Sequence, residues 1–327
     1  MKKRKRLWIP EYTPVQTVVE FPTITLGGHY HVYLIDAETK KVKQELEFSN
    51  LITDAGLDFI GTGITLSTIY TTLVVGIDDT TPTISDIALG NEIADTTNSD
   101  GQADVDGSET VPVEFAFRRR VRQFNENEAN GDLKELGWKV GSVVANRTLF
   151  KDFEGNLITI FKTDRDILKI VYEYRIFATP NDITGSFIFS AGSGSVFYTI
   201  RPMNTTVALG WNKLLDDMGD YSDIEAKVHE SNVFVDRTLA NNPAPRVSET
   251  SSSFATYVPG TFFRDMTYKW DFSVGVFDNQ INLVTWNPWP DQFSGGLMIW
   301  QMHLSSSIEK TSANRLDITF RQRWTRE

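Results

Sequence analysis

Two segments of the chain alternate between core-facing and outward-facing positions with a period of two. The core-facing positions are Leu168, Ile170 and Tyr172 in the first segment and Leu316, Ile318 and Phe320 in the second. This period indicates a β-strand with one buried face and one face toward water. Antiparallel sheets are the ones that commonly leave one face to solvent. The pattern therefore predicts antiparallel β structure in both halves of the chain.

The two segments also match each other in sequence at an offset of 148 residues. Residues 160–175 (IFKTDRDILKIVYEYR) align with residues 308–323 (IEKTSANRLDITFRQR). The same ungapped offset pairs Trp138 with Trp286, Phe115 with Phe263, and Phe124 with Phe272. Two unrelated strands that share a Lys-Thr turn would explain the short match but not the aromatic pairs. We therefore predict a tandem internal duplication.

Breaks in the pattern divide the chain into an arm and two domains. Pro and Asn interrupt it around residues 178–185, and 327 residues suit two domains of roughly 100–200 residues each. We expect a basic extended arm at 1–20, a first domain at 21–178 and a second at 181–327. The expected fold is mainly β, with two tandem antiparallel β-sandwiches that each carry one short helix.

Short helices are expected at three places. Thr53 or Asp54 can cap a helix that ends at Gly61. Residues 86–94, opened by Ser85, suggest another, and residues 207–218 suggest one in the second half. The polar, acidic residues 95–110 are expected to form a loop.

Composition narrows the classes of function. With 40% hydrophobic and 23% charged residues, the chain is ordinary globular protein. Its apolar runs are far shorter than the ~20 residues of a membrane span, and MKKRKR is followed by LWIPEY, which is unlike a secretory signal. The absence of cysteine fits folding in a reducing cytoplasm. A net charge of −11 argues against nucleic acid as a partner. We expect neither a nucleic-acid nor a membrane partner.

The catalytic inventory is thin. Four histidines and no cysteine leave few residues for a nucleophile–base pair, and no HExxH, GxSxG, GxGxxG or P-loop motif is present. His29 and His31 share a strand face, which two metal ligands can use. Strand histidines are more often surface or packing residues. We therefore assign no catalytic, cofactor-binding or metal-binding residue, and expect a protein that is not an enzyme and has no cofactor.

An acidic stretch at 102–113 partly resembles a calcium-binding loop. Asp104 and Asp106 fit the pattern, but Gln102 and Val113 stand where a carboxylate and a bidentate Glu are needed. We expect a solvated, mobile loop there instead.

Four arginines follow this stretch: Arg118, Arg119, Arg120 and Arg122. Alternation places them on different faces of a strand, which disfavours a nucleic-acid patch. A local or inter-subunit salt-bridge network is the expectation.

Six of the eight tryptophans lie in the second half. Trp286 and Trp324 match apolar or aromatic positions of the first copy and are expected in the core. Trp289 lies in the turn NPWPDQ without a counterpart, so we expect it to be exposed and available to a glycan or a protein partner.

The chain begins with a basic cluster formed by Lys2, Lys3, Arg4, Lys5 and Arg6. Five charges are too few to hold membrane or DNA firmly at physiological salt. We expect this arm to bind a neighbouring subunit or protein, with Trp8 as a buried anchor. A disordered terminus is the alternative.

Three stretches together resemble structural proteins of tailed-bacteriophage virions, usually described as tail fibre, tail-tip or minor tail proteins. The stretches are NLITDAGLDFIGTG, LVVGIDDTTPTISDIALGNEI and GWKVGSVVANRTLFKDFEGNLITIFKTDRDILKIVYEY. The matching positions are Asn50, Ile52, Thr53, Ala55, Gly56, Leu57 and Asp58; Val75, Gly76, Pro82, Asp86, Leu89 and Glu92; and Asn146, Arg147, Leu149, Phe150, Lys162 and Thr163. The resemblance covers mainly residues 45–177 and, more loosely, 260–327.

The resemblance implies a structural protein of the phage virion, most simply a tail-associated adaptor, tail-tip or fibre protein. Its expected partners are further copies of itself, as a trimer or hexamer ring, other tail or neck proteins and, at attachment, a host surface glycan. Its expected location is the virion tail, after assembly in the host bacterial cytoplasm. A carbohydrate-binding or depolymerising module, and a capsid decoration or collar protein, are the alternatives.

Overall fold

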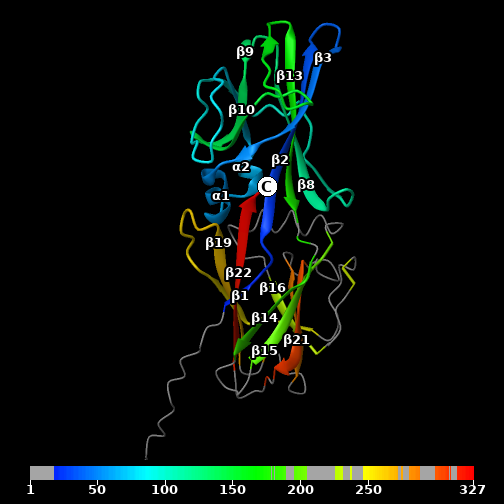
Figure 1. Cartoon of the computed structure of the whole chain (residues 1–327), viewed down its shortest axis with the longest axis vertical. Coiled ribbons are helices and arrows are strands. Elements are labelled where there is room, and N and C mark those ends of the chain that lie inside the picture. Colours follow the sequence, from blue (N-terminus) through cyan, green and yellow to red (C-terminus); the bar gives the residue numbers. More distant parts are fainter. Residues whose placement is uncertain are drawn as a thin grey trace, which may run out of the picture.

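The structure is a computed structural model of the chain, drawn in Figure 1. It describes residues 18–177, 179, 181–188, 195–204, 225–230, 236–237, 246–271, 274, 280–287, 299–308, 310 and 315–327. The molecule is elongated, with the first half of the sequence at one end and most of the second half at the other (Figure 1). The C-terminus lies near the middle, close to β2 and the two helices (Figure 1).

Strands dominate the first half of the chain. They are β1 (Val18–Glu20), β2 (Ile24–Asp36), β3 (Val42–Ser49), β4 (Leu51–Ile52), β5 (Thr72–Gly76), β6 (Glu92–Thr96), β7 (Val105–Glu109), β8 (Phe115–Phe124), β9 (Gly131–Leu133), β10 (Glu135–Val140), β11 (Val143–Leu149), β12 (Ile160–Lys162) and β13 (Asp166–Phe177). Two short helices accompany them: α1 (Asp54–Gly61) and α2 (Leu66–Ile69).

The described part of the second half consists of further strands. They are β14 (Ile183–Ile188), β15 (Ser195–Pro202), β16 (Glu225–His229), β17 (Arg246–Ser248), β18 (Ser251–Phe254), β19 (Phe263–Trp270), β20 (Ile281–Asn287), β21 (Trp300–Ile308) and β22 (Leu316–Arg326). No helix in the described residues is both long and apolar enough to cross a membrane.

One large sheet extends through both halves. It is nine-stranded, in the order β18-β19-β22-β2-β13-β8-β7, with β1 added on β22 and β3 on β2. The halves join where β2 and β22 run parallel, from the pair Ile24 and Trp324 to the pair Leu26 and Arg326. The mainly β prediction is confirmed. The division into two domains stays a prediction, because this sheet is continuous across the expected boundary.

A smaller sheet packs against each half of the large one. In the first half it is five-stranded, in the order β4-β11-β10-β5-β6; in the second it is six-stranded, in the order β14-β15-β21-β20-β16-β17. Trp138 of β10 contacts Tyr172 of β13, with ring centroids 5.5 Å apart. Trp286 of β20 contacts Phe320 of β22, with ring centroids 4.2 Å apart. Each half is therefore sandwich-like, with a tryptophan crossing between its layers.

The core-facing positions of the two alternating segments are buried as predicted. Leu168, Ile170, Tyr172, Leu316, Ile318 and Phe320 are all at most 5% exposed and belong to one hydrophobic core. Burial of each aliphatic side chain contributes about 1.5–3 kcal/mol. Trp286 and Trp324 are buried too, as expected.

The helix predicted after Thr53 is present and explains part of the local sequence. The Thr53 hydroxyl accepts a hydrogen bond from the Gly56 amide (3.0 Å) and donates one to the Val144 carbonyl (2.8 Å). A Cβ on Gly56 would lie 2.0 Å from the Ala145 carbonyl oxygen. A capping residue and a glycine therefore let α1 lie directly on β11.

The first half has two short helices, α1 and α2, where one per half was expected. Two further local predictions in this half are wrong. Residues 86–94 do not form a helix; the segment ends in β6, which extends the five-stranded sheet by pairing with β5. Residues 105–109 are not loop but the edge strand β7 on β8. In both cases pairing with an open sheet edge overrides the local sequence preference. The helix predicted at 207–218 lies outside the described residues.

Candidate functional site

Two of the residues that carry the phage resemblance, Arg147 and Asp86, meet at the loop 77–91. Arg147 of β11 donates from Nε to Glu135 Oε2 of β10 (2.8 Å), from Nη1 to Asp86 Oδ2 (2.8 Å) and from Nη2 to Asp78 Oδ2 (3.1 Å). Glu135 is fully buried and Arg147 is 4% exposed. The Glu135 carboxylate also accepts from the amides of Gly90 (3.0 Å) and Asn91 (2.9 Å). This cluster, which we call the Arg147 lock, fixes the loop at both ends.

Hydrogen bonds within the Arg147 lock favour the charged forms of Arg147, Asp86 and Asp78. Burial alone would lower the pKa of Arg147, but hydrogen bonds to Asp86 and Glu135 outweigh it and raise that pKa. Burial would raise the pKa of Asp86, but hydrogen bonds from Thr83 and Arg147 lower it. Hydrogen bonds from Thr80, followed by Arg147, lower the pKa of Asp78. The three carboxylates hold Arg147 in one position, and through it the lock fixes the loop against β10 and β11.

Asn146, the residue before Arg147, joins the two layers of the first half. Its Oδ1 accepts from the Tyr30 hydroxyl (2.9 Å) and from the Trp138 amide (3.1 Å), and its Nδ2 donates to the Tyr172 hydroxyl (2.9 Å). Asn146, Tyr30 and Tyr172 are all fully buried. Burial raises the pKa of both tyrosines well above the ordinary value, which keeps them neutral. Asn146 and Arg147, which are adjacent in the phage-like motif, therefore both have structural contacts: Asn146 joins the two layers and Arg147 holds the loop.

The four arginines of β8 find partners within the chain. Arg118 Nε lies 2.6 Å from Asp106 Oδ1, and Arg120 Nε lies 2.9 Å from Asp104 Oδ1. On the opposite face, Arg119 Nε donates to Glu173 Oε1 at 2.9 Å.

Arg122, the fourth arginine of β8, binds the backbone instead of a carboxylate. Its Nε donates to the Thr71 carbonyl oxygen at 2.8 Å. The local network expected from the sequence is therefore present, and an inter-subunit role stays a prediction. Asp104 and Asp106, which partly resembled a calcium loop, bind arginines instead.

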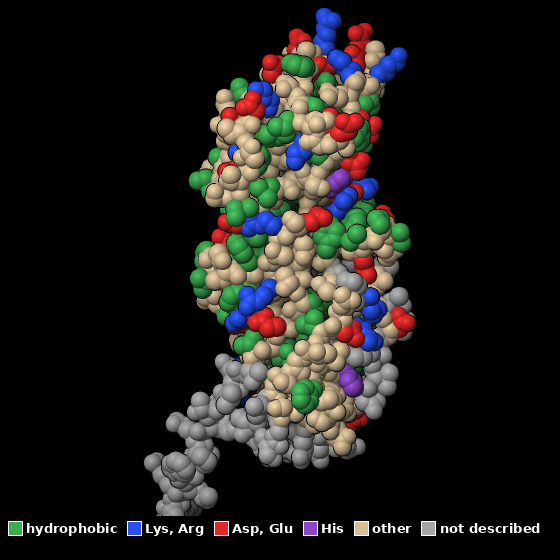
Figure 2. Space-filling model, in the orientation of Figure 1, with side chains coloured by type: hydrophobic (Ala, Val, Ile, Leu, Met, Phe, Trp, Pro, Cys, Tyr) green, Lys and Arg blue, Asp and Glu red, His purple; other side chains and the backbone are tan. Residues whose placement is uncertain are grey.

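Two other predicted sites cannot be placed. The basic arm (Lys2, Lys3, Arg4, Lys5, Arg6 and Trp8) and Trp289 lie outside the described residues. On the face drawn in Figure 2, basic and acidic side chains are interspersed over the described part and hydrophobic ones are scattered between them.

His29 and His31 share a face of β2, as predicted, and meet a residue that the sequence analysis did not single out. Glu47 of β3 lies opposite His31 in the hairpin, with its Oε1 2.7 Å from His29 Nε2 and 3.4 Å from His31 Nε2. Burial and the nearby Arg175 lower the pKa of His29, and Glu47 opposes this only in part. Glu47 comes next to the two histidines through the register of β2 and β3, which the sequence alone does not give.

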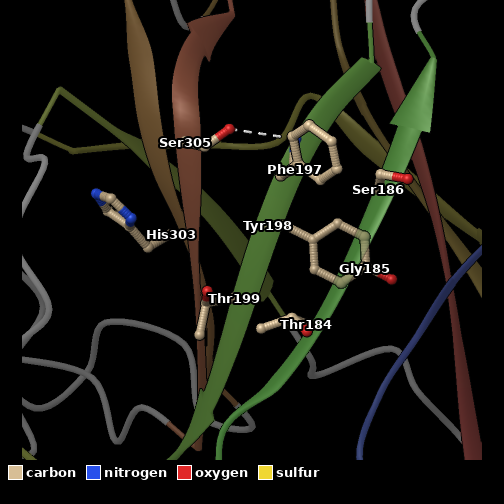
Figure 3. Close-up of a pocket in the computed structure, with 8 residues that line it drawn as sticks. All are labelled: Thr184, Gly185, Ser186, Phe197, Tyr198, Thr199, His303 and Ser305. Carbon is tan, nitrogen blue, oxygen red and sulfur yellow. Dashed lines mark hydrogen bonds between the residues drawn. The ribbon is translucent and has the colours of Figure 1, made fainter.

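A shallow hollow of about 380 Å³ lies on the six-stranded sheet, over β14, β15 and β21 (Figure 3). Its lining residues are Thr184, Gly185, Ser186, Phe197, Tyr198, Thr199, His303 and Ser305. Phe197 is 61% exposed, and its amide donates to Ser305 Oγ at 3.2 Å. An exposed aromatic ring among hydroxyl groups is a surface on which a sugar ring can stack and form hydrogen bonds.

Comparisons with known proteins add no relative. No protein-family model, no curated protein and no solved structure matches the chain.

Proposed function

We propose that this protein is a structural component of a tailed-phage virion, tail-associated as an adaptor, tail-tip or fibre protein, and acts by protein–protein assembly. The proposal rests on the structural contacts of the residues that resemble those of phage virion proteins. Thr53 and Gly56 seat α1, Asn146 joins the layers, and Arg147 fixes a loop. Residues that resemble those of virion proteins thus build a rigid β scaffold, which is what an assembly component requires.

Self-association belongs to the same proposal. Homo-oligomers generally close by point-group symmetry, and a chain with two related halves can form a ring of pseudo-six-fold symmetry as a trimer. Other tail or neck proteins would contact this ring, and the basic arm would reach onto a neighbouring copy.

Deleting residues 2–9 tests the assembly role. We expect the truncated protein to stay folded, with unchanged thermal stability, and to be missing from purified particles. Replacing Lys2, Lys3, Arg4, Lys5 and Arg6 by Ser while keeping Trp8 separates the contribution of charge from that of the anchor. A truncated protein that enters particles as well as the full chain would contradict an assembly role for the arm.

A glycan-binding module is the second candidate, and the hollow at Phe197 favours it. A glycan array of host polysaccharides provides the test, with Phe197→Ala and Trp289→Ala as variants. Phe153, which is 70% exposed in the first half, gives the matched control Phe153→Ala. Binding that is lost in either variant but kept in the control would favour this candidate, whereas no binding by the full chain would favour the assembly role alone.

A capsid decoration or collar protein is the third candidate. It would share the scaffold and differ only in where the protein is found, so labelling particles with an antibody against the chain separates it from the tail proposal.

A further inference from the structure

The outer face of the β2–β3 hairpin gathers two imidazoles and one carboxylate. His29 and His31 lie two residues apart on the 13-residue strand β2, and Glu47 is the cross-strand partner of His31. One ligand atom from each of the three lies within 4.8 Å of the others. Their side chains are 13%, 30% and 43% exposed, respectively, so the cluster is partly accessible to solvent.

The spacing of these atoms is close to that of a zinc site. Metal–ligand bonds of about 2.0–2.2 Å in a tetrahedron place neighbouring donor atoms roughly 3.3 Å apart. The distance from Glu47 Oε1 to His31 Nε2 is already 3.4 Å, and that to His29 Nε2 is 2.7 Å, a hydrogen bond that a cation would replace. Glu47 is the most exposed of the three, so rotation of its side chain can open the second distance.

The surrounding backbone holds the two histidine positions in place. β2 is paired along its length with β3 on one side and with β13 on the other. The His29 ring is held through Nε2 alone, because its buried Nδ1 has no hydrogen-bond partner. The ring can therefore turn to meet a metal ion without breaking a second hydrogen bond.

Nearby positive charge is only partly compensated, because two arginines share one carboxylate. Arg175 and Arg119, on the neighbouring strands, both donate to the Glu173 carboxylate, at 2.8 Å and 2.9 Å. Glu47 adds the negative charge that lies next to the two imidazoles. A divalent cation at this point would meet the Glu47 carboxylate directly, against the one positive charge that the two arginines leave uncompensated.

We propose that His29, His31 and Glu47 bind a divalent transition-metal ion, with zinc as the best match to two imidazoles and one carboxylate. The three ligands leave a coordination position that faces solvent, open to water or to a donor from another protein. The proposal is independent of the virion role and revises the sequence analysis, which assigned no metal ligand.

Calorimetric titration of ZnCl₂ into the full chain, stripped of metal with a chelator and buffered at pH 7.5, tests the proposal. We expect one saturable site per chain with a dissociation constant in the micromolar range. His31→Gln and Glu47→Gln should each weaken binding by at least about tenfold. Glu45→Gln, an exposed neighbour on β3 outside the cluster, is the matched control and should bind zinc like the unaltered chain.

Co²⁺ provides a second readout that does not depend on heat. The chain should give the visible absorption bands of Co²⁺ in a site of low coordination number, and the two ligand variants should lose them. Circular dichroism in the absence of metal should show that all three variants are folded. No saturable zinc binding up to millimolar concentration, or equal binding by all variants, would overturn the proposal.

Discussion

Lys162 and Lys310, the lysines of the repeated Lys-Thr pair, are both buried although lysine is seldom buried without a partner. Each ammonium group donates to a backbone carbonyl oxygen just beyond the end of a strand, Lys162 to Asn125 after β8 (2.9 Å) and Lys310 to Asp271 after β19 (2.8 Å). Burial lowers the pKa of both lysines. The sequence repeat identified these two lysines as equivalent positions. Their carbonyl partners depend on strand register and could not be predicted.

The Arg147 lock should be the most sensitive polar site of the first half. Arg147→Met would leave the Glu135 carboxylate buried without its counter-ion, which typically costs about 3–5 kcal/mol. Urea unfolding measures the loss. Lys134→Met is the control, since Lys134 pairs with the 69% exposed Asp79 and its loss should leave the urea midpoint nearly unchanged. Equal, small losses for both variants would show that the lock does not hold the loop.

Glu249 should make stability depend on pH. Burial is the main reason that its pKa is raised to about 7, although its carboxylate accepts a hydrogen bond from the Ala226 amide (3.0 Å). The folded state holds this proton more tightly than the unfolded state. The stabilisation that the protonated Glu249 contributes is therefore fully present below about pH 4.5 and is lost as the pH rises through about 7.

Glu249→Gln should remove that loss. Relative to the unaltered chain, the variant should be more stable by about 1–3 kcal/mol at pH 8 and about equally stable at pH 4. Thermal unfolding at the two pH values measures this, with Glu38→Gln in an exposed turn as the control for removing one carboxylate. A Glu249→Gln variant with no pH-dependent advantage would contradict the assignment.

At the scale of elements, helix α1 belongs to the first half but is held by the second. Asp58 Oδ1 accepts from the Tyr257 hydroxyl (2.5 Å) and the Gly260 amide (2.7 Å), and the Leu57 carbonyl accepts from Trp324 Nε1 (3.0 Å). The cap and length of α1 could be predicted, because Thr53 and Gly61 are local signals. Its partners could not, since they lie 199 to 267 residues further along the chain.

Asp58→Ala should loosen this contact. Removing the shared acceptor leaves the Tyr257 hydroxyl and the Gly260 amide without it, at a cost of about 1–3 kcal/mol. Hydrogen exchange should show faster opening of residues 255–262, while β13 stays protected. Asp132→Ala, at an exposed position of β9, is the control. Unchanged exchange in residues 255–262 would mean that the two halves are held together elsewhere.

At the scale of the whole molecule, positions 148 residues apart make equivalent contacts. Trp138 meets Tyr172 as Trp286 meets Phe320, the two buried lysines bind carbonyls after paired strands, and Phe115 and Phe263 begin β8 and β19. These contacts support the tandem duplication, which stays a prediction. Leu168 pairs with Phe124 but Leu316 pairs with Trp270, so the register differs by two residues, which keeps the same faces inward.

The shared sheet should make the two halves unfold together. Calorimetry of the full chain should show one transition whose calorimetric and van't Hoff enthalpies agree. Truncation after residue 315 removes β22, which pairs with β19, β1 and β2, and should destabilise both halves. Two separate transitions in the full chain would instead favour independent domains.

The location of the protein in the virus particle tests the central claim most directly. An electron cryo-microscopy reconstruction of the phage, into which the structure is fitted, gives both place and symmetry. We expect copies in the tail, arranged as a ring in which the first and second halves alternate around the axis. Absence of the protein from the particle, or its presence only on the capsid, would contradict the account.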